Sequence, residues 1–120
     1  MGYKIKKFQS SNGCEILVGQ DDLSNDHLTF KVGKPNDIWM HVSGVPGSHV
    51  VLKCENVDRL CLDDAAGLAA WYSKMRGGGK VAVNYCFVKN VNKPRGAKPG
   101  SVRISREKKI KARPKLLEEI

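Results

Sequence analysis

The sequence predicts an α+β fold with a mostly antiparallel, twisted sheet of about seven strands and two main helices. Three observations predict it. Short apolar runs, several of them alternating, recur along the chain and are separated by Gly, Pro, Ser and Asn. Only two segments carry helix signals, and they do not alternate regularly with the strands. A length of 120 residues suits one domain, so we expect a single domain over residues 1–120.

The N-terminal part predicts a hairpin followed by a short helix. Apolar runs at residues 3–8 and 14–18 flank the turn residues 10–13, which is the pattern of two paired strands. Residues 24–26 are of the types that cap helix N-termini. Gly33 can close this helix, because glycine accepts the left-handed backbone found at many helix ends.

The middle of the chain predicts two strands, a helix and a third strand. Residues 37–42 alternate polar with apolar, and residues 49–52 form a run rich in β-branched side chains. The clearest helix is residues 63–76, which is rich in alanine, with Asp63 or Asp64 as its cap and glycines after it. Residues 81–88 then alternate again, as in a half-buried strand.

The C-terminal part predicts less regular structure. Residues 90–100 contain two prolines and two glycines, which excludes a regular helix or strand there. Residues 101–104 and 109–113 are expected to be short strands around a turn at 105–108. Residues 114–120 are expected to be a frayed tail.

Composition excludes several classes of protein. No apolar run approaches the roughly 20 residues of a membrane span, and the N-terminus lacks the apolar stretch of a signal peptide, so we expect a cytoplasmic protein without membrane contact. The cysteines form no CxxC pair and there are only three histidines, so we expect buried free thiols, no metal and no cofactor. The cysteines stand at positions 14, 54, 61 and 86.

The excess positive charge is confined to the last third of the chain. Residues 1–79 hold nine Lys and Arg against nine Asp and Glu, whereas residues 80–120 hold twelve Lys and Arg against three Glu. The whole net charge of +9 therefore comes from the last 41 residues. Segregated basic charge attracts polyanions, although a solvated surface that keeps a small protein soluble has the same composition.

One predicted strand carries a row of polar and aromatic side chains. Asp37, Trp39 and His41 share one face of the strand at 37–42, and Ser48 and His49 begin the next strand. If these strands pair, the two imidazoles lie close together and Asp37 can fix a histidine tautomer. A buried polar network that orders the sheet accounts for the row equally well. A hydrolase is disfavoured, because the GxSxG motif is absent.

Residues 89–100, which we call the basic loop, have the composition of a phosphate-binding segment. Proline reduces the entropy lost on binding, and glycine lets backbone amides approach a phosphate. No GxxxxGK[ST] motif is present, so nucleotide hydrolysis is not expected. The helix end at 73–80 adds further cations, although cations at a helix C-terminus also complement the helix dipole. The expected phosphate contacts are Lys89, Lys93, Arg95, Lys98 and Arg103.

Six ordered blocks cover most of residues 8–104. Residues 45–52 read VPGSHVVL, and the last block begins at residue 81 and ends with KNVNKPRGAKPG at residues 89–100. The other four blocks are residues 8–19, 25–29, 37–42 and 69–74. Together they resemble the NFACT-R domain, the C-terminal RNA-binding module of a ribosome-quality-control family that includes RqcH, NEMF and fibronectin/fibrinogen-binding-type proteins, with Met40 standing where relatives commonly have Phe.

The resemblance implies an RNA-binding module that contacts rRNA or tRNA, with the large ribosomal subunit as a possible partner. Tail elongation is not implied, because it belongs to assemblies with additional domains. A protein-docking module that recruits a separately encoded partner is the main alternative, and the oligomeric state is left open. The expected nucleic-acid-binding residues are Asn25, Asp26, Asp37, Trp39, His41, Ser48, His49, Ser73, Lys74, Lys89, Lys93, Arg95, Lys98 and Arg103.

Overall fold

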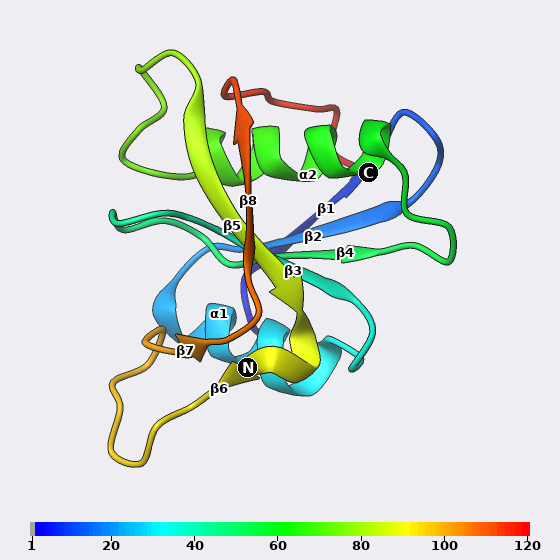
Figure 1. Ribbon diagram of the computed structural model, residues 1–120. Coiled ribbons are helices and arrows are strands. Elements are labelled where there is room, and N and C mark those ends of the chain that lie inside the picture. The colour runs from blue at the N-terminus through cyan, green and yellow to red at the C-terminus, as the bar shows by residue number, and fades with distance from the viewer. Residues whose placement is uncertain (1) are drawn as a thin grey trace.

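The computed structural model describes residues 2–120 and confirms the α+β class (Figure 1). Six strands form one sheet in the order β1-β2-β4-β3-β5-β8, and every neighbouring pair is antiparallel. Two short strands, β6 and β7, form a separate ladder. The strands are β1 Ile5–Gln9, β2 Glu15–Gly19, β3 Ile38–Val42, β4 Val50–Lys53, β5 Val81–Phe87, β6 Val91–Asn92, β7 Arg103–Ile104 and β8 Lys108–Ala112.

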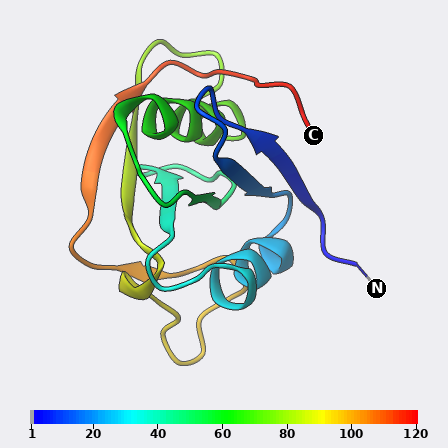
Figure 2. The same ribbon diagram turned by 90° about the vertical axis from the view of Figure 1, so that its right-hand side faces the viewer.

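The sheet has a covered face on each side. The helix α2 (Arg59–Trp71) packs against one face, and α1 (Asp22–His27) with the π-helix η1 (Leu28–Val32) lies on the other (Figure 2). A short 3-10 helix, η2 (Val88–Asn90), follows β5. The alternation along β3 divides its side chains between two cores, because Met40 joins the cluster under α2 and Trp39 joins the cluster under η1.

Three of the four helix ends lie at other residues than the sequence predicts. The first begins at Asp22 and is capped by Asp21, whose carboxylate accepts from the Ser24 amide at 2.7 Å. It ends at Gly33 as expected, after a π-helical turn. The helix α2 begins four residues before the predicted start, because Asp58 is its N-cap. Its backbone leaves the helix after Trp71, ahead of the glycines at 77–79.

The carboxylate of Asp64 does not cap the helix as expected. It is buried inside α2, where it accepts from the amide and the hydroxyl of Ser11 and from Lys115 Nζ at 2.7 Å. Lys115 therefore neutralises a buried carboxylate and ties the C-terminal segment to the helix. One cation of the basic third is thus held at the α2 side of the molecule.

The predicted strands near the C-terminus exist but do not pair with each other. Strand β7 pairs with β6, and β8 pairs with β5. The register places Ile110 opposite Val83, so Ile110 and Ala112 fill the edge of the core under α2. Burial of these two side chains explains why β8 adds to the main sheet.

The expectation of free thiols is wrong for two of the four cysteines. Cys14 and Cys54 form a disulfide, whereas Cys61 and Cys86 are free and buried. Glu15 of β2 lies opposite Lys53 of β4, so the residues just outside these strands face each other, with a Cα–Cα distance of 5.2 Å. Within residues 2–120, no helix has both the length and the apolar character needed to cross a bilayer.

Candidate nucleic-acid interface

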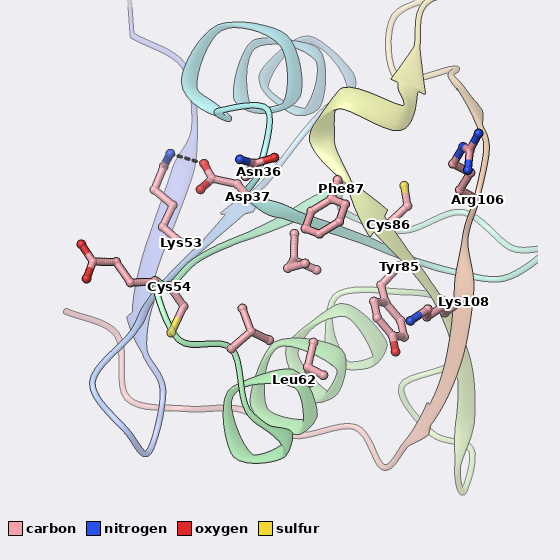
Figure 3. Close-up of a pocket in the computed structure, with 13 residues that line it drawn as sticks. Asn36, Asp37, Lys53, Cys54, Leu62, Tyr85, Cys86, Phe87, Arg106 and Lys108 are labelled. Carbon is pink, nitrogen blue, oxygen red and sulfur yellow. Dashed lines mark hydrogen bonds and ion pairs between the residues drawn. The ribbon is translucent and has the colours of Figure 1, made fainter.

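Asp37 lies apart from the imidazoles, which corrects the expected pairing. Its carboxylate accepts from the Lys34 amide at 2.8 Å and from Lys53 Nζ. Asp37 precedes β3 by one residue, so the chain has not yet entered the pleat that aligns Trp39 with His41. Figure 3 shows Asp37 and Lys53 at the side of a different groove, of about 950 Å³. A role for Asp37 as the orienting partner of a histidine is therefore excluded.

The two imidazoles do lie close together, as the sequence predicts. The ring centroids of His41 and His49 are 5.7 Å apart, and that of Trp39 lies 5.1 Å from His49. Trp39 and His49 are each only 2% exposed, however. Neither ring is available to stack on a base, because η1 and the segments that follow β5 cover that part of the sheet.

A chain of hydrogen bonds fixes the tautomer of His49. Trp39 Nε1 donates to Thr29 Oγ1 at 3.2 Å, and Thr29 Oγ1 lies 2.9 Å from His49 Nδ1. His49 Nε2 lies 3.2 Å from the carbonyl oxygen of Gly100, which accepts only. The proton is therefore on Nε2, and Nδ1 accepts from the threonine hydroxyl. Through this chain, the core of the sheet holds the end of the basic loop.

Both imidazoles are neutral at pH 7. Burial is the main cause that lowers the pKa of His49 to about 4, and the neighbouring His41 lowers it further. Burial also lowers the pKa of His41, although backbone contacts with Val42 and Gly47 oppose this shift. The two imidazoles consequently add no positive charge, and the positive charge of this region comes from lysine and arginine.

Helix α1 holds the start of β4 and the basic loop in place. Asn25 is buried, and its Oδ1 accepts from the His49 amide at 3.0 Å. Asp26 accepts from the Gly100 amide at 3.0 Å and pairs with Lys93 Nζ at 2.9 Å. Lys93 Nζ also donates to the carbonyl oxygens of Lys98 and Ser101. Asn25, Asp26 and Lys93 are therefore positioning residues, and the charge of Lys93 is compensated inside the protein.

The remaining predicted residues gather around two adjoining hollows. His41, Gly47 and Lys98 line a hollow of about 590 Å³ beneath the basic loop. A second hollow, of about 380 Å³, is lined by Ser48, Lys74 and neighbouring residues. The two hollows share Asp22, Asn25, Pro46 and Gly47, so they form one continuous surface. We call this surface the His41 face.

Backbone contacts bring the end of α2 to this surface. Gly47 forms an isolated bridge with Ser73, and the Ser48 amide donates to the Tyr72 carbonyl at 2.9 Å. An added Cβ at Gly47 would lie 2.9 Å from Ser73 Cβ, so glycine permits the close approach. Ser73 itself caps the helix end, donating to the Ala70 carbonyl at 2.7 Å. Lys74 is thereby exposed beside Ser48 and Pro46.

Sequence reasoning missed a row of side chains next to His41. The ladder pairs His41 with Asn84 and Asn84 with Lys109, so the three share one face of the sheet. Lys109 is exposed, and its Nζ lies 3.5 Å from Ser43 Oγ in the turn after β3. Asn84 Oδ1 is buried and has no hydrogen-bond partner among the described residues. These residues come together only through the strand register, which cannot be read from the sequence.

The other predicted cations are more dispersed. Lys89 is exposed and lies 5.1 Å above the ring of Phe87, a residue of the groove in Figure 3. Arg103 is exposed on β7, and Arg95 is exposed in the basic loop beside Gly96, whose φ is +76°. Figure 1 shows this loop projecting from the rest of the molecule beyond β6 and β7. The cations of the last third therefore do not all lie on one face, and Lys98 and Lys109 are the ones beside His41.

Comparison with known proteins identifies close relatives. Residues 4–106 match the model of the NFACT protein RNA binding domain. Over 98 residues the chain is 40% identical to the Rqc2 homolog RqcH of Bacillus subtilis, an alignment covering 82% of this chain and 17% of the relative. It is 43% identical over 114 residues to the Rqc2 homolog RqcH of Streptococcus suis, covering 92% and 20%. The chain thus spans about a fifth of the length of these relatives.

Two further relatives bear on the fold and on the breadth of the similarity. A solved structure, the C-terminal part of the fibronectin/fibrinogen-binding protein from Streptococcus suis, superposes with a TM-score of 0.92 at 37% identity. The superposition covers 96% of this chain and 47% of that one. Coiled-coil domain-containing protein 25 of Bos taurus is 31% identical over 112 residues, covering 85% of this chain and 52% of the relative. The similarity therefore extends over the whole fold.

Proposed function

The chain belongs to the family of NFACT RNA-binding domains, and on that premise we propose that it binds structured RNA through the His41 face. The RNA is rRNA or tRNA, and the setting is ribosome-associated quality control in the cytoplasm. The large ribosomal subunit is the partner that this proposal implies. The observation that carries the proposal is the placement of three lysines near the neutral, half-buried His41. Lys98 lines the same hollow as His41, Lys74 lines the adjoining hollow, and Lys109 lies on the same sheet face two strands away.

The charges and the hollows of this face complement a sugar–phosphate chain. Lysine ammonium groups supply contacts to phosphates that position a nucleic acid without reading its sequence. His41 lines the hollow beneath the basic loop, and its imidazole is half-buried there. A ribose 2′-hydroxyl can hydrogen-bond to an imidazole nitrogen, and it distinguishes RNA from DNA. We therefore assign phosphate contacts to the lysines and ribose recognition to His41.

We assign no catalytic role to the Asp37, Ser48 and His49 set. A serine nucleophile needs a neighbouring base with a free nitrogen. Both ring nitrogens of His49 are engaged, by Thr29 and by Gly100, and Asp37 is paired with Lys53. These contacts favour a positioning role for His49 and leave Ser48 without an activating partner.

A protein-docking function is the second candidate, and one observation favours it. The groove in Figure 3 is lined by apolar side chains, among them Val57, Leu62 and the half-exposed Phe87, with Arg106 and Lys108 at its side. Apolar grooves with a charged border are typical of contacts with other proteins. Co-purification of a protein partner that survives nuclease treatment, and that Phe87→Ala abolishes, would support this second function.

The proposed RNA binding is tested by titrating the 120-residue chain with tRNA, with an rRNA fragment and with DNA of matched length over a range of salt concentrations. We expect log Kd to rise linearly with log salt, with a slope of about 0.7–0.9 per phosphate contacted. RNA should bind more tightly than DNA, and His41→Ala should reduce that preference. Binding that does not depend on salt, or an equal affinity for DNA, would contradict the proposal.

A further inference from the structure

Three cysteines from distant parts of the chain converge at one end of the core under α2. Cys14 directly precedes β2, Cys54 directly follows β4, and Cys61 is the third residue of α2. Their sulfur atoms all lie within 4.8 Å of one another. Cys14 and Cys54 are half-buried and Cys61 is fully buried. The sequence offers no sign of this cluster, because 40 residues separate Cys14 from Cys54.

We propose that the reduced chain binds one zinc ion through the thiolates of Cys14, Cys54 and Cys61. A zinc–sulfur distance of about 2.3 Å in tetrahedral geometry places the sulfur atoms about 3.8 Å apart. The cluster therefore needs only small side-chain shifts once the bond between Cys14 and Cys54 is opened. Thiolate ligands also select zinc over magnesium and calcium, which prefer oxygen.

The surroundings of the cluster favour a cation. A hollow of about 440 Å³ lies over Cys14 and Cys54, and Glu15, Glu55 and Asp58 are among the residues that line it. One cation, Lys53, also lines the hollow, but its Nζ is paired with Asp37, so the three carboxylates are in excess at this opening of a chain whose net charge is +9. They draw a cation toward the sulfurs, and the hollow leaves space for water as a fourth ligand. The Asp58 carboxylate is occupied as the cap of α2, so it is not counted as a ligand.

Cys61 Sγ, the third sulfur, is fixed in position by outer contacts of the kind that orient metal ligands. The Asp58 amide donates to Cys61 Sγ at 3.3 Å, and the capped first turn of α2 fixes the backbone of Cys61. The Cys61 thiol in turn donates to the Asp58 carbonyl oxygen at 3.2 Å, and a bound zinc ion would displace that proton.

The oxidised and the zinc-bound forms exclude each other. A thiol reductant gives two electrons and two protons to the Cys14–Cys54 bond, yields two thiols and is itself converted to a disulfide. Zinc then takes three thiolates and releases three protons. The disulfide and the metal join the same strand ends, β2 and β4, but only the metal also joins them to α2.

The test uses the full chain reduced with a phosphine and titrated with Zn²⁺, and with Co²⁺ as a spectroscopic reporter. We expect one metal per chain, a thiolate-to-cobalt charge-transfer band, and three sulfur ligands by X-ray absorption of the zinc form. Cys61→Ala should weaken zinc binding by more than about 100-fold, since outer contacts alone are worth 10–100-fold. Cys86→Ala is the matched control, because Cys86 is free and buried in the other core.

Several results would overturn the proposal. These are the absence of zinc binding by the reduced chain, an unchanged zinc affinity in Cys61→Ala, and an absorption spectrum with only nitrogen and oxygen ligands. Circular dichroism of each variant distinguishes a lost ligand from a lost fold. If Cys61→Ala does not fold, Cys14→Ser is measured in its place and is expected to lose zinc binding in the same way. The oxidised chain, in which two of the three sulfurs are bonded to each other, is expected to bind none.

Discussion

Replacing Lys74, Lys98 and Lys109 together by alanine is expected to weaken RNA binding by about 100-fold at 0.1 M salt and to lower the salt slope by about two to three. Lys74 and Lys98 line the hollows of the His41 face, Lys109 lies on the same sheet face two strands from His41, and each of the three is exposed. Each contact with a phosphate releases about one counterion, so the loss of three contacts lowers the slope of log Kd against log salt by about two to three. Filter binding or fluorescence anisotropy at four salt concentrations measures both quantities.

A control triple variant separates this effect from the loss of net charge. Lys6, Arg59 and Lys108 carry the same total charge and belong to the other side of the sheet. Lys6 lies opposite Val18 of the α2 core, Arg59 begins α2, and Lys108 lies opposite Tyr85, which packs against the same core. Their replacement by alanine should change affinity less than about threefold, through long-range charge alone. Equal losses in the two triple variants would contradict a localised interface.

Acidification is expected to destabilise the fold by roughly 3 kcal/mol between pH 6.5 and pH 4 through His49 alone. The pKa of His49 is about 4 in the folded chain, mainly because of burial, and about 6.5 is usual when the chain is unfolded. Between these values the unfolded chain binds more protons, so stability falls as pH falls. The contribution is complete above pH 6.5 and is lost by about pH 4. His41 adds a change of the same sign.

Denaturant unfolding at a series of pH values measures this dependence. His49→Gln should be less stable than the parent chain at pH 7, but the difference between them should shrink as pH approaches 4. His27→Gln is the control, because His27 lies outside the Trp39–Thr29–His49 chain and stacks on Tyr3. A difference between parent and His49→Gln that stays constant from pH 7 to pH 4 would contradict the assigned tautomer and pKa.

The sequence predicts the hairpin, the placement of Trp39 and His41 on one strand face, and the proximity of His41 to His49. These depend on the twofold period of a strand and on one short turn. Whether the strand face that carries Trp39 and His41 is exposed does not follow from the twofold period. The cover over this face comes from η1 and from the segments that follow β5. Trp39, which the sequence places among the expected nucleic-acid-binding residues, is for this reason buried beneath them.

Long-range pairing decides the features that sequence reasoning missed. Lys93 looks like a free cation in the basic loop, but its partner Asp26 stands 67 residues earlier. Lys109 lies on the same sheet face as His41 only because of the register of β3, β5 and β8. The N-cap of α2 was missed because Asp58, Asp63 and Asp64 are all acceptable caps, and the burial of Asp64 with Ser11 and Lys115 decides among them.

The central claim is that RNA binds on the His41 face, and amide chemical-shift mapping of the ¹⁵N-labelled chain with tRNA and with an rRNA fragment tests it most directly. The account predicts the largest shifts at His41, Ser48, Lys74, Lys98 and Lys109, with little change at the exposed residues of α2. Shifts confined to α2, or to the groove around Phe87, would contradict it.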